Sequence, residues 1–126
     1  MTEIKDFYQL KAWKKSHQLT ILIYKITKSF PKEEKYGLTD QLRRAASSVG
    51  ANIAEGFGRY HFADKAKFYY QARGSLKEVQ NFLFLVKDLN HLDTKKAEKL
   101  SQEVKSCEML INGLIRSVNN QKHSPC

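Results

Sequence analysis

The stretch Leu38-Thr-Asp-Gln-Leu-Arg-Arg-Ala-Ala-Ser-Ser-Val-Gly-Ala-Asn-Ile-Ala-Glu-Gly-Phe-Gly-Arg59 decides the fold, because it places three different surfaces on a single predicted helix. At about 100° per residue, one face is apolar and is formed by Leu38, Leu42, Ala45, Val49, Ile53 and Phe57. A polar stripe beside it contains Gln41, Arg44, Ser48, Asn52, Glu55 and Arg59. The other flank carries the small residues Ser47, Gly50, Ala51 and Ala54.

The two flanks of this helix indicate different contacts. Gly and Ser have lower helix propensity than Ala, so a helix that accumulates them usually gains a close approach to another helix. The polar stripe has two interpretations. It contains acid-first pairs four residues apart, such as Asp40 and Arg44, which are typical of a solvent-exposed face. Alternatively, Gln41, Asn52 and Glu55 form a structural polar motif that orders the bundle or meets the polar groups of a partner.

Three further amphipathic segments accompany this helix. The sequence predicts helices over about residues 8–29, 38–58, 62–89 and 94–118, with a disordered tail at 119–126. Pro31 ends the first helix, because the residue before a proline avoids the helical conformation. Gly56-Phe-Gly58 terminates the second helix. With short connectors, these helices predict one all-α domain, an antiparallel up-and-down four-helix bundle.

Each of the other helices has an expected core stripe. In the first helix the stripe is Leu10, Trp13, His17, Thr20 or Ile21, Tyr24, and Thr27 or Lys28, widened by Ile23 and Ile26. In the third helix it is Ala66, Tyr69, Ala72, Leu76, Val79, Leu83 and Val86. In the fourth helix it is Ala97, Leu100, Val104, Cys107, Ile111, Leu114 and Val118, alternating at three and four residues as in left-handed bundles.

The third helix carries more apolar surface than one core needs. Tyr70 and Phe84 point away from its core stripe, and Phe82 and Leu85 lie on further sides. A helix that is apolar on several sides is buried on several sides, which favours burial against copies of this chain. The alternative is an over-long core stripe within a monomer. The candidate oligomer interface consists of Ser47, Gly50, Ala54, Tyr70, Phe82, Phe84 and Leu85.

The chain of 126 residues is strongly basic, with a formal net charge of +9 and a sequence pI near 9.6. Such a charge favours anionic partners such as nucleic acid, although it would also arise on a surface that only keeps the protein soluble. No helix-turn-helix, RNA-recognition or zinc-finger signature is present, so shape and charge would provide the recognition. The candidate phosphate-binding residues are Lys11, Lys14, Lys15, Arg43, Arg44, Arg59, Lys95, Lys96 and Lys99.

The sequence contains no constellation that indicates catalysis. It has no His-Glu-x-x-His motif, no Walker loop and no cysteine cluster with zinc spacing. We therefore expect no enzymatic activity, metal, cofactor or small-molecule substrate, and we expect His17 to be a half-buried packing residue. Two cysteines give no disulfide framework, and the longest apolar run, Phe82 to Val86, is too short for a membrane span. These features predict a soluble cytoplasmic protein.

The sequence motifs resemble those of a family of small four-helix-bundle proteins, first noticed as open reading frames inside intervening sequences of bacterial 23S ribosomal RNA genes. The matching segments are Phe7-Tyr-Gln-Leu-Lys-Ala-Trp13, Phe30-Pro-Lys-Glu-Glu34, Tyr36-Gly-Leu38, Gln41-Leu-Arg-Arg-Ala-Ala46, Asn52-Ile-Ala-Glu-Gly56 and Gly74-Ser-Leu-Lys-Glu78. The resemblance extends to the accessory variability determinant proteins of diversity-generating retroelements, which bind a reverse transcriptase and its template RNA.

The resemblance implies a homopentameric bundle without catalytic residues. Combined with the charge, it predicts a non-catalytic basic scaffold that binds RNA or a nucleoprotein partner such as a reverse transcriptase. An oligomeric protein-interaction module without nucleic-acid binding is the alternative.

Overall fold

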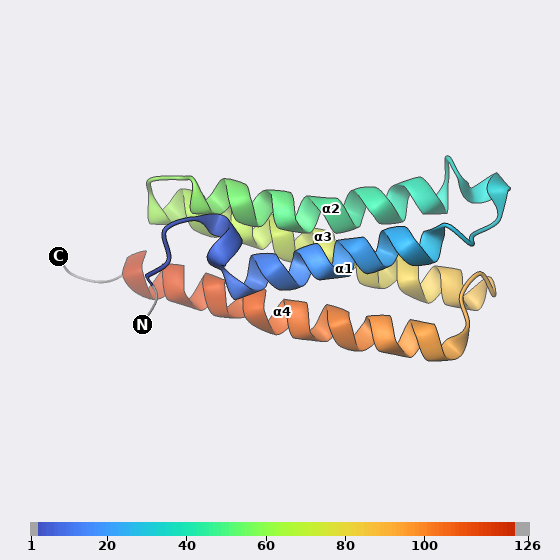
Figure 1. The fold of residues 1–126 in the computed structure, drawn as a ribbon. Helices are drawn as coiled ribbons and strands as arrows, with labels where there is room; N and C mark the ends of the chain where they lie inside the picture. Colours follow the sequence, from blue (N-terminus) through green and yellow to red (C-terminus); the bar gives the residue numbers. More distant parts are fainter. Residues whose placement is uncertain (1–2, 123–126) are drawn as a thin grey trace.

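The computed structural model describes residues 3–122. A short 3-10 turn η1 (Phe7–Gln9) precedes α1 (Lys11–Thr27), and a second turn η2 (Lys32–Glu34) leads to α2 (Leu38–Phe57). Two long helices follow, α3 (Phe62–Asp88) and α4 (Thr94–Lys122) (Figure 1). Within the described range there are four α-helices and no strand, so the prediction of an all-α fold is confirmed.

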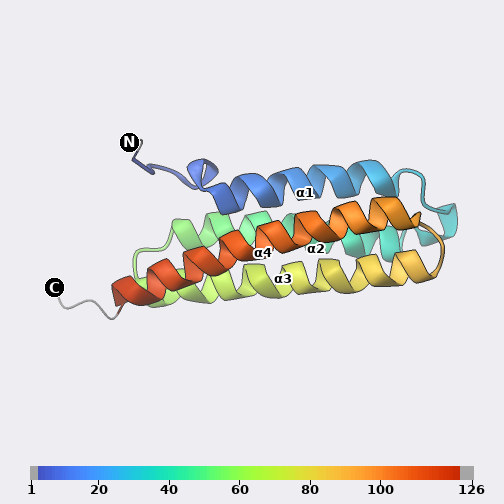
Figure 2. The same ribbon diagram turned by 90° about the horizontal axis from the view of Figure 1, so that it is seen from below.

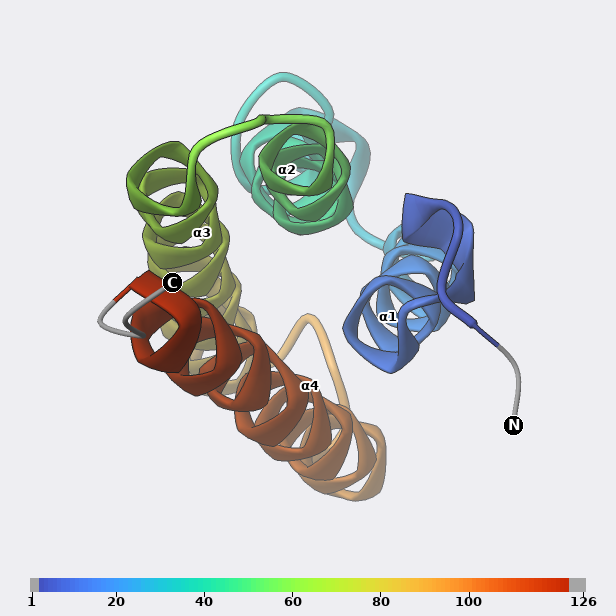
Figure 3. The ribbon, with the colours of Figure 1, turned by 90° about the vertical axis from the view of Figure 1, so that its left-hand side faces the viewer.

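The four helices lie around one shared core. Helix α1 packs against α2 and α4, and α3 packs against the same two helices. The colours in Figure 1 run in one direction along α1 and α3 and in the other along α2 and α4. Seen from below, α4 passes between α1 and α3 (Figure 2). In the end view, α4 is inclined to its neighbours and meets α3 at its C-terminal end (Figure 3).

The ends of the first and last helices differ from those predicted. Asp6 caps the turn η1 by accepting a hydrogen bond from the amide of Phe7, and Leu10 is extended, so α1 begins at Lys11 rather than near residue 8. It ends at Thr27. Helix α4 continues to Lys122, so residues 119–122 of the predicted disordered tail are helical. The rest of that tail, residues 123–126, lies outside the described residues.

The core stripe of α1 was predicted with the wrong rotation. Its buried residues are Ala12, Ser16, Leu19, Ile23 and Thr27, whereas Ile21, Tyr24 and His17 are exposed. The pattern had included Ile23 and Thr27, but it counted the rings of His17 and Tyr24 as core and overlooked Ser16. Ser16 and Thr27 can be buried because each hydroxyl donates to a carbonyl of its own helix, at 2.8 Å and 2.7 Å.

The core stripes of the other helices are largely as predicted. All seven residues expected in α3 are buried. In α4 six of the seven are buried, and Ile115 takes the place of the partly buried Leu114. In α2 the central apolar residues are buried, and the terminal Leu38 and Phe57 are partly buried. These three helices therefore supply most of the large apolar side chains of the core.

Gly56 has a packing role that the sequence analysis missed. It belongs to the Gly56-Phe-Gly58 segment that was predicted to terminate the helix, and α2 does end there, with Phe57 as its last residue and Gly58 as its C-cap. Gly56 is buried, and a Cβ atom on it would lie 2.7 Å from Cε1 of Tyr69 and 3.1 Å from Cβ of Phe68. The absent side chain thus lets the α3 ring pack directly onto the backbone of α2.

Candidate nucleic-acid interface

The nine candidate basic residues do not form one continuous surface. Lys11 and Lys14 lie at the start of α1, whereas Lys95 and Lys96 lie at the start of α4. These two helix starts are at opposite ends of the bundle (Figure 1). All four side chains are exposed. The described surface therefore carries two separate lysine clusters, one at each end.

Lys15 and Lys99 lie between these clusters, in a shallow groove between α1 and α4. The groove is lined by both lysines together with Gln18, Ile21, Leu22 and Glu103. The ammonium of Lys15 lies 2.6 Å from Oε2 of Glu103, and both side chains are partly buried. The charge of Lys15 is thus balanced within the fold, while Lys99 stays exposed.

Arg43 ties α2 to α1 instead of facing solvent. Its Nε donates to the hydroxyl of Thr27 at 2.8 Å, and its Nη2 donates to the carbonyl of Tyr24 at 3.3 Å. Its guanidinium also lies 4.6 Å from the centroid of the Tyr24 ring, a cation–π geometry. These donors stabilise the helix pair, and a role of Arg43 in binding phosphate stays a prediction. The buried Thr27 hydroxyl gave no signal in the sequence that it would receive them.

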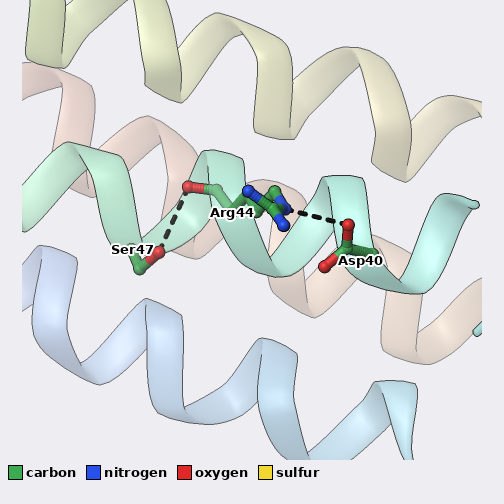
Figure 4. A network of polar contacts seen from close by, with 3 residues as sticks. All are labelled: Asp40, Arg44 and Ser47. Atoms are coloured by element: carbon green, nitrogen blue, oxygen red, sulfur yellow. Dashed lines mark hydrogen bonds and ion pairs between the residues drawn. The ribbon is translucent and has the colours of Figure 1, made fainter. Parts of the chain in front are cut away.

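Arg44 and Arg59 form the acid-first pairs expected from their spacing. Nε of Arg44 lies 2.8 Å from Oδ2 of Asp40, and the hydroxyl of Ser47 donates to the carbonyl of Arg44 (Figure 4). Nη2 of Arg59 lies 2.7 Å from Oε1 of Glu55. The Arg44 side chain is 78% exposed, so this pair contributes little stability and leaves the guanidinium open to solvent.

The polar stripe of α2 is partly exposed to solvent and partly in contact with another helix, so each of the two interpretations holds for a part of it. Its centre faces α3, where the hydroxyls of Ser48 and Ser75 lie 2.9 Å apart and Asn52 donates to the Ser48 hydroxyl at 3.0 Å. Its ends, Gln41 and Glu55, are exposed. Two of the segments that carry the family resemblance, those containing Gln41 and Gly74, therefore lie side by side on α2 and α3. Between them is a shallow pocket lined by Gln41, Arg44, Ala45, Ser48, Ser75, Glu78 and Phe82.

Within the small-residue flank of α2, Gly50 faces α1 of the same chain. A Cβ atom on Gly50 would lie 3.3 Å from the hydroxyl of Ser16 and 3.4 Å from Nε1 of Trp13. The predicted close helix approach is present, but we correct its assignment to an interface between copies, because Gly50 faces α1. Ser47 is exposed and Ala54 is partly buried.

Helix α3 exposes part of its extra apolar surface. Phe84 is 59% exposed, and Leu85 and Tyr70 are also exposed. Phe82 is partly buried and packs against the core, and its place in the candidate interface stays a prediction. The Tyr70 hydroxyl accepts a hydrogen bond from Asn119 of α4 at 3.1 Å. Phe84 is thus the most exposed of the four candidates on α3.

Two exposed aromatic residues were not singled out from the sequence. Tyr60, in the turn between α2 and α3, is 88% exposed, and Tyr8 of η1 is 55% exposed. Neither belongs to a periodic stripe, so periodicity gave no signal for them. The sequence did offer another signal, because basic residues lie within a few positions of both tyrosines.

The described residues offer little reactive chemistry. No group of three or more His, Cys, Asp or Glu residues within 3–122 is placed to hold a metal ion. Cys107 is buried, and burial raises the pKa of its thiol to about 12. In this part of the chain, no helix combines the length and apolar character that crossing a membrane requires.

Comparison with known proteins gives one family and one similar fold. The family model described as 23S rRNA-intervening sequence protein matches residues 8–113. A crystal structure of a protein of unknown function from the S23 ribosomal protein family of Bacteroides thetaiotaomicron is similar, with a TM-score of 0.74. It is 20% identical, and the match covers 82% of this chain and 97% of that one. No curated protein matches.

Proposed function

Since this chain belongs to the 23S rRNA-intervening sequence protein family, we propose that it is a non-catalytic, basic scaffold that assembles with copies of itself and associates with RNA. We take the assembly to be a homopentamer of antiparallel up-and-down bundles that acts in the cytoplasm. The relation to retroelement accessory proteins is part of the same proposal and adds a reverse transcriptase as a possible partner.

The observation that carries the RNA proposal is a set of exposed cations that the fold does not use. Of the described residues, five candidate lysines are exposed and form no ion pair: Lys11, Lys14, Lys95, Lys96 and Lys99. Unpaired lysines on a chain of net charge +9 can neutralise phosphates and release condensed counterions. By contrast, Lys15 and Arg43 have partners inside the bundle.

A salt titration against a structured RNA tests this proposal, with light scattering on the same sample to give the particle mass. We expect a particle several times the mass of the monomer. We also expect the logarithm of the binding constant to fall linearly with the logarithm of salt concentration, by about 0.9 per phosphate contact. An oligomer that binds no RNA at low salt would contradict the RNA proposal.

Charge-matched variants locate the contact. Replacing Lys11 and Lys14 with Gln should weaken binding and reduce the salt slope by about one for each lost phosphate contact. Replacing Lys25 and Lys28, exposed residues at the other end of the same helix region, removes the same charge and should have a smaller effect. The same replacement at Lys95 and Lys96 tests the second cluster. Equal losses in all variants would indicate a diffuse charge effect rather than an interface.

Assembly through α3 has its own matched pair of variants. Phe84→Lys places a charge on the predicted interface and should reduce the particle mass, because burying an unpaired ammonium against another copy is strongly unfavourable. Met109→Lys makes the same change at an exposed residue of α4, which is 72% exposed, and should leave the mass unchanged. An unaltered mass for Phe84→Lys would rule out this interface.

A second candidate function is a protein-interaction module without nucleic-acid binding. The exposed apolar side chains of Phe84 and Leu85 favour it, since such patches mark interfaces. A purified reverse transcriptase that is retained by the oligomer at high salt, where RNA is released, would support this second function.

A further inference from the structure

One end of the bundle carries exposed aromatic rings from two segments of the chain. Figure 3 looks onto this end, which carries η1 and the turn between α2 and α3. The 3-10 turn η1 packs against both α1 and α2. Tyr8 extends from it with 55% exposure, and the α2–α3 turn contributes Tyr60 at 88% and Phe62 at 39%. We call these three residues the ring cluster.

The ring cluster stands on a fixed base. The Phe7 ring packs edge-on against Tyr8 and against Trp13, with centroids 5.7 Å and 5.3 Å apart. His17 stacks on Trp13 at 4.6 Å with an interplanar angle of 15°. Gly50 leaves room for the Trp13 indole on α2. The rings of η1 are thus ordered before any ligand binds, which reduces the conformational entropy lost on binding.

The turn that carries Tyr60 is also held in place. The ammonium of Lys65 donates to the carbonyl of Phe57 at 2.7 Å, across the turn, and burial lowers the pKa of Lys65. The guanidinium of Arg59 lies 4.7 Å from the centroid of the Phe68 ring. His61 packs edge-on against Tyr60, with centroids 5.0 Å apart. These contacts present the Tyr60 ring on a defined backbone rather than on a free loop.

Positive charge surrounds the ring cluster. Residues 3–17 contain four lysines and two acidic residues, and residues 55–67 contain three basic and two acidic residues. Asp6 is engaged as a cap of η1 and Glu55 is paired with Arg59. Lys11 and Lys14 are exposed and without an ion pair to any residue of 3–122. These two lysines are therefore available to phosphates.

From this combination we propose that the ring cluster and the adjacent lysines bind single-stranded RNA, with unpaired bases stacking on Tyr60 and Tyr8 while Lys11 and Lys14 contact the phosphates. Aromatic rings beside cations are the recurring recognition elements for single strands, because every base offers a face for stacking. Bases inside a duplex are already stacked and their faces are covered, so a duplex cannot use the rings. This inference rests on the proposed RNA association and assigns the RNA class and the place on the fold.

The test measures binding of a fluorescent oligouridine and of an RNA duplex of equal length to the intact protein. We expect the oligouridine to bind more tightly. Tyr60→Ala and Tyr8→Ala should each weaken oligouridine binding by about tenfold, the loss typical of one stacked base, while duplex binding stays unchanged. Tyr60→Phe should retain binding, because it keeps the ring. Since both tyrosines are largely exposed, these variants should keep the fold, which circular dichroism checks.

A matched control lies at the other end of the bundle. Tyr36, between α1 and α2, is 86% exposed and also has a lysine, Lys35, over its ring. Tyr36→Ala should leave oligouridine binding unchanged. The inference is overturned if Tyr36→Ala weakens binding as much as Tyr60→Ala, if Tyr60→Ala has no effect, or if the duplex binds more tightly. In these cases RNA association itself still stands, whereas a wild-type protein that binds neither RNA contradicts both proposals.

Discussion

The ring of Tyr69 on α3 lies where a side chain on Gly56 of α2 would have to be: a Cβ atom there would come within 2.7 Å of Cε1. The first prediction follows from this contact. Gly56→Ala should lower the free energy of unfolding by about 1–3 kcal/mol, because overpacking forces a buried ring or the backbone to shift. Urea denaturation followed by circular dichroism measures the change.

Gly74 provides the control for that substitution. It also lies inside a helix, but a Cβ atom on it would meet no atom within 4 Å. Gly74→Ala should therefore raise the free energy of unfolding by about 0.5–1 kcal/mol through the higher helix propensity of alanine. A destabilised Gly74→Ala variant, or an unaffected Gly56→Ala variant, would show that the α2–α3 contact is not the constraint.

The second prediction separates two adjacent arginines. Arg43→Gln should lower the free energy of unfolding by about 1.5–3 kcal/mol, since it removes charge-assisted hydrogen bonds to Thr27 and Tyr24. Arg44→Gln should change it by less than about 1 kcal/mol, because the exposed pair with Asp40 contributes little. Thermal melts of both variants test this, and similar stabilities for the two would contradict it. Under conditions where both variants are folded, Arg44→Gln should weaken RNA binding more than Arg43→Gln.

The third prediction concerns the thiol of Cys107. Burial raises its pKa to about 12, so almost no thiolate forms near pH 8. In a Cys126→Ser background, which removes the other cysteine, an aromatic disulfide reagent should label the native protein much more slowly than the urea-unfolded chain. Equal labelling rates in the two states would show that the α4 core opens freely.

The fourth prediction concerns alkaline stability. Burial raises the pKa of Tyr69 to about 12, from 10.0 in an accessible tyrosine. The folded state thus holds this proton more tightly, so its contribution to stability is complete below pH 10 and is lost as the pH rises toward 12. Tyr69→Phe should reduce the loss of stability between pH 10 and 12, as measured by urea denaturation at each pH. Identical pH profiles for the wild-type protein and this variant would contradict the assignment.

The sequence predicted the helices and three of the four core stripes well, because α2, α3 and α4 bury apolar residues at regular spacing. It was partly wrong on α1, where Ser16 is buried by hydrogen bonding to its own helix and Tyr24, which was expected in the core, is exposed next to Arg43. The hydropathy pattern alone cannot predict such hydrogen bonds and ring–cation contacts. For the same reason the sequence could identify the basic candidates but could not separate those with partners inside the bundle from those that are exposed. Partners such as Thr27 and Glu103 come from other helices.

The contacts of α1 have a consequence for the order in which the bundle opens. This helix buries small or hydroxyl side chains at Ala12, Ser16 and Thr27, and only Leu19 and Ile23 are large. It is joined to α2 by polar contacts such as that of Thr20 with the carbonyl of Ala46. Fewer large apolar side chains are fully buried in α1 than in its neighbours, and segments with few buried apolar contacts open at low free energy. The amide protons of α1 should accordingly exchange with solvent before those of α3. Helix α1 would then unfold locally while α2, α3 and α4 remain folded as one unit.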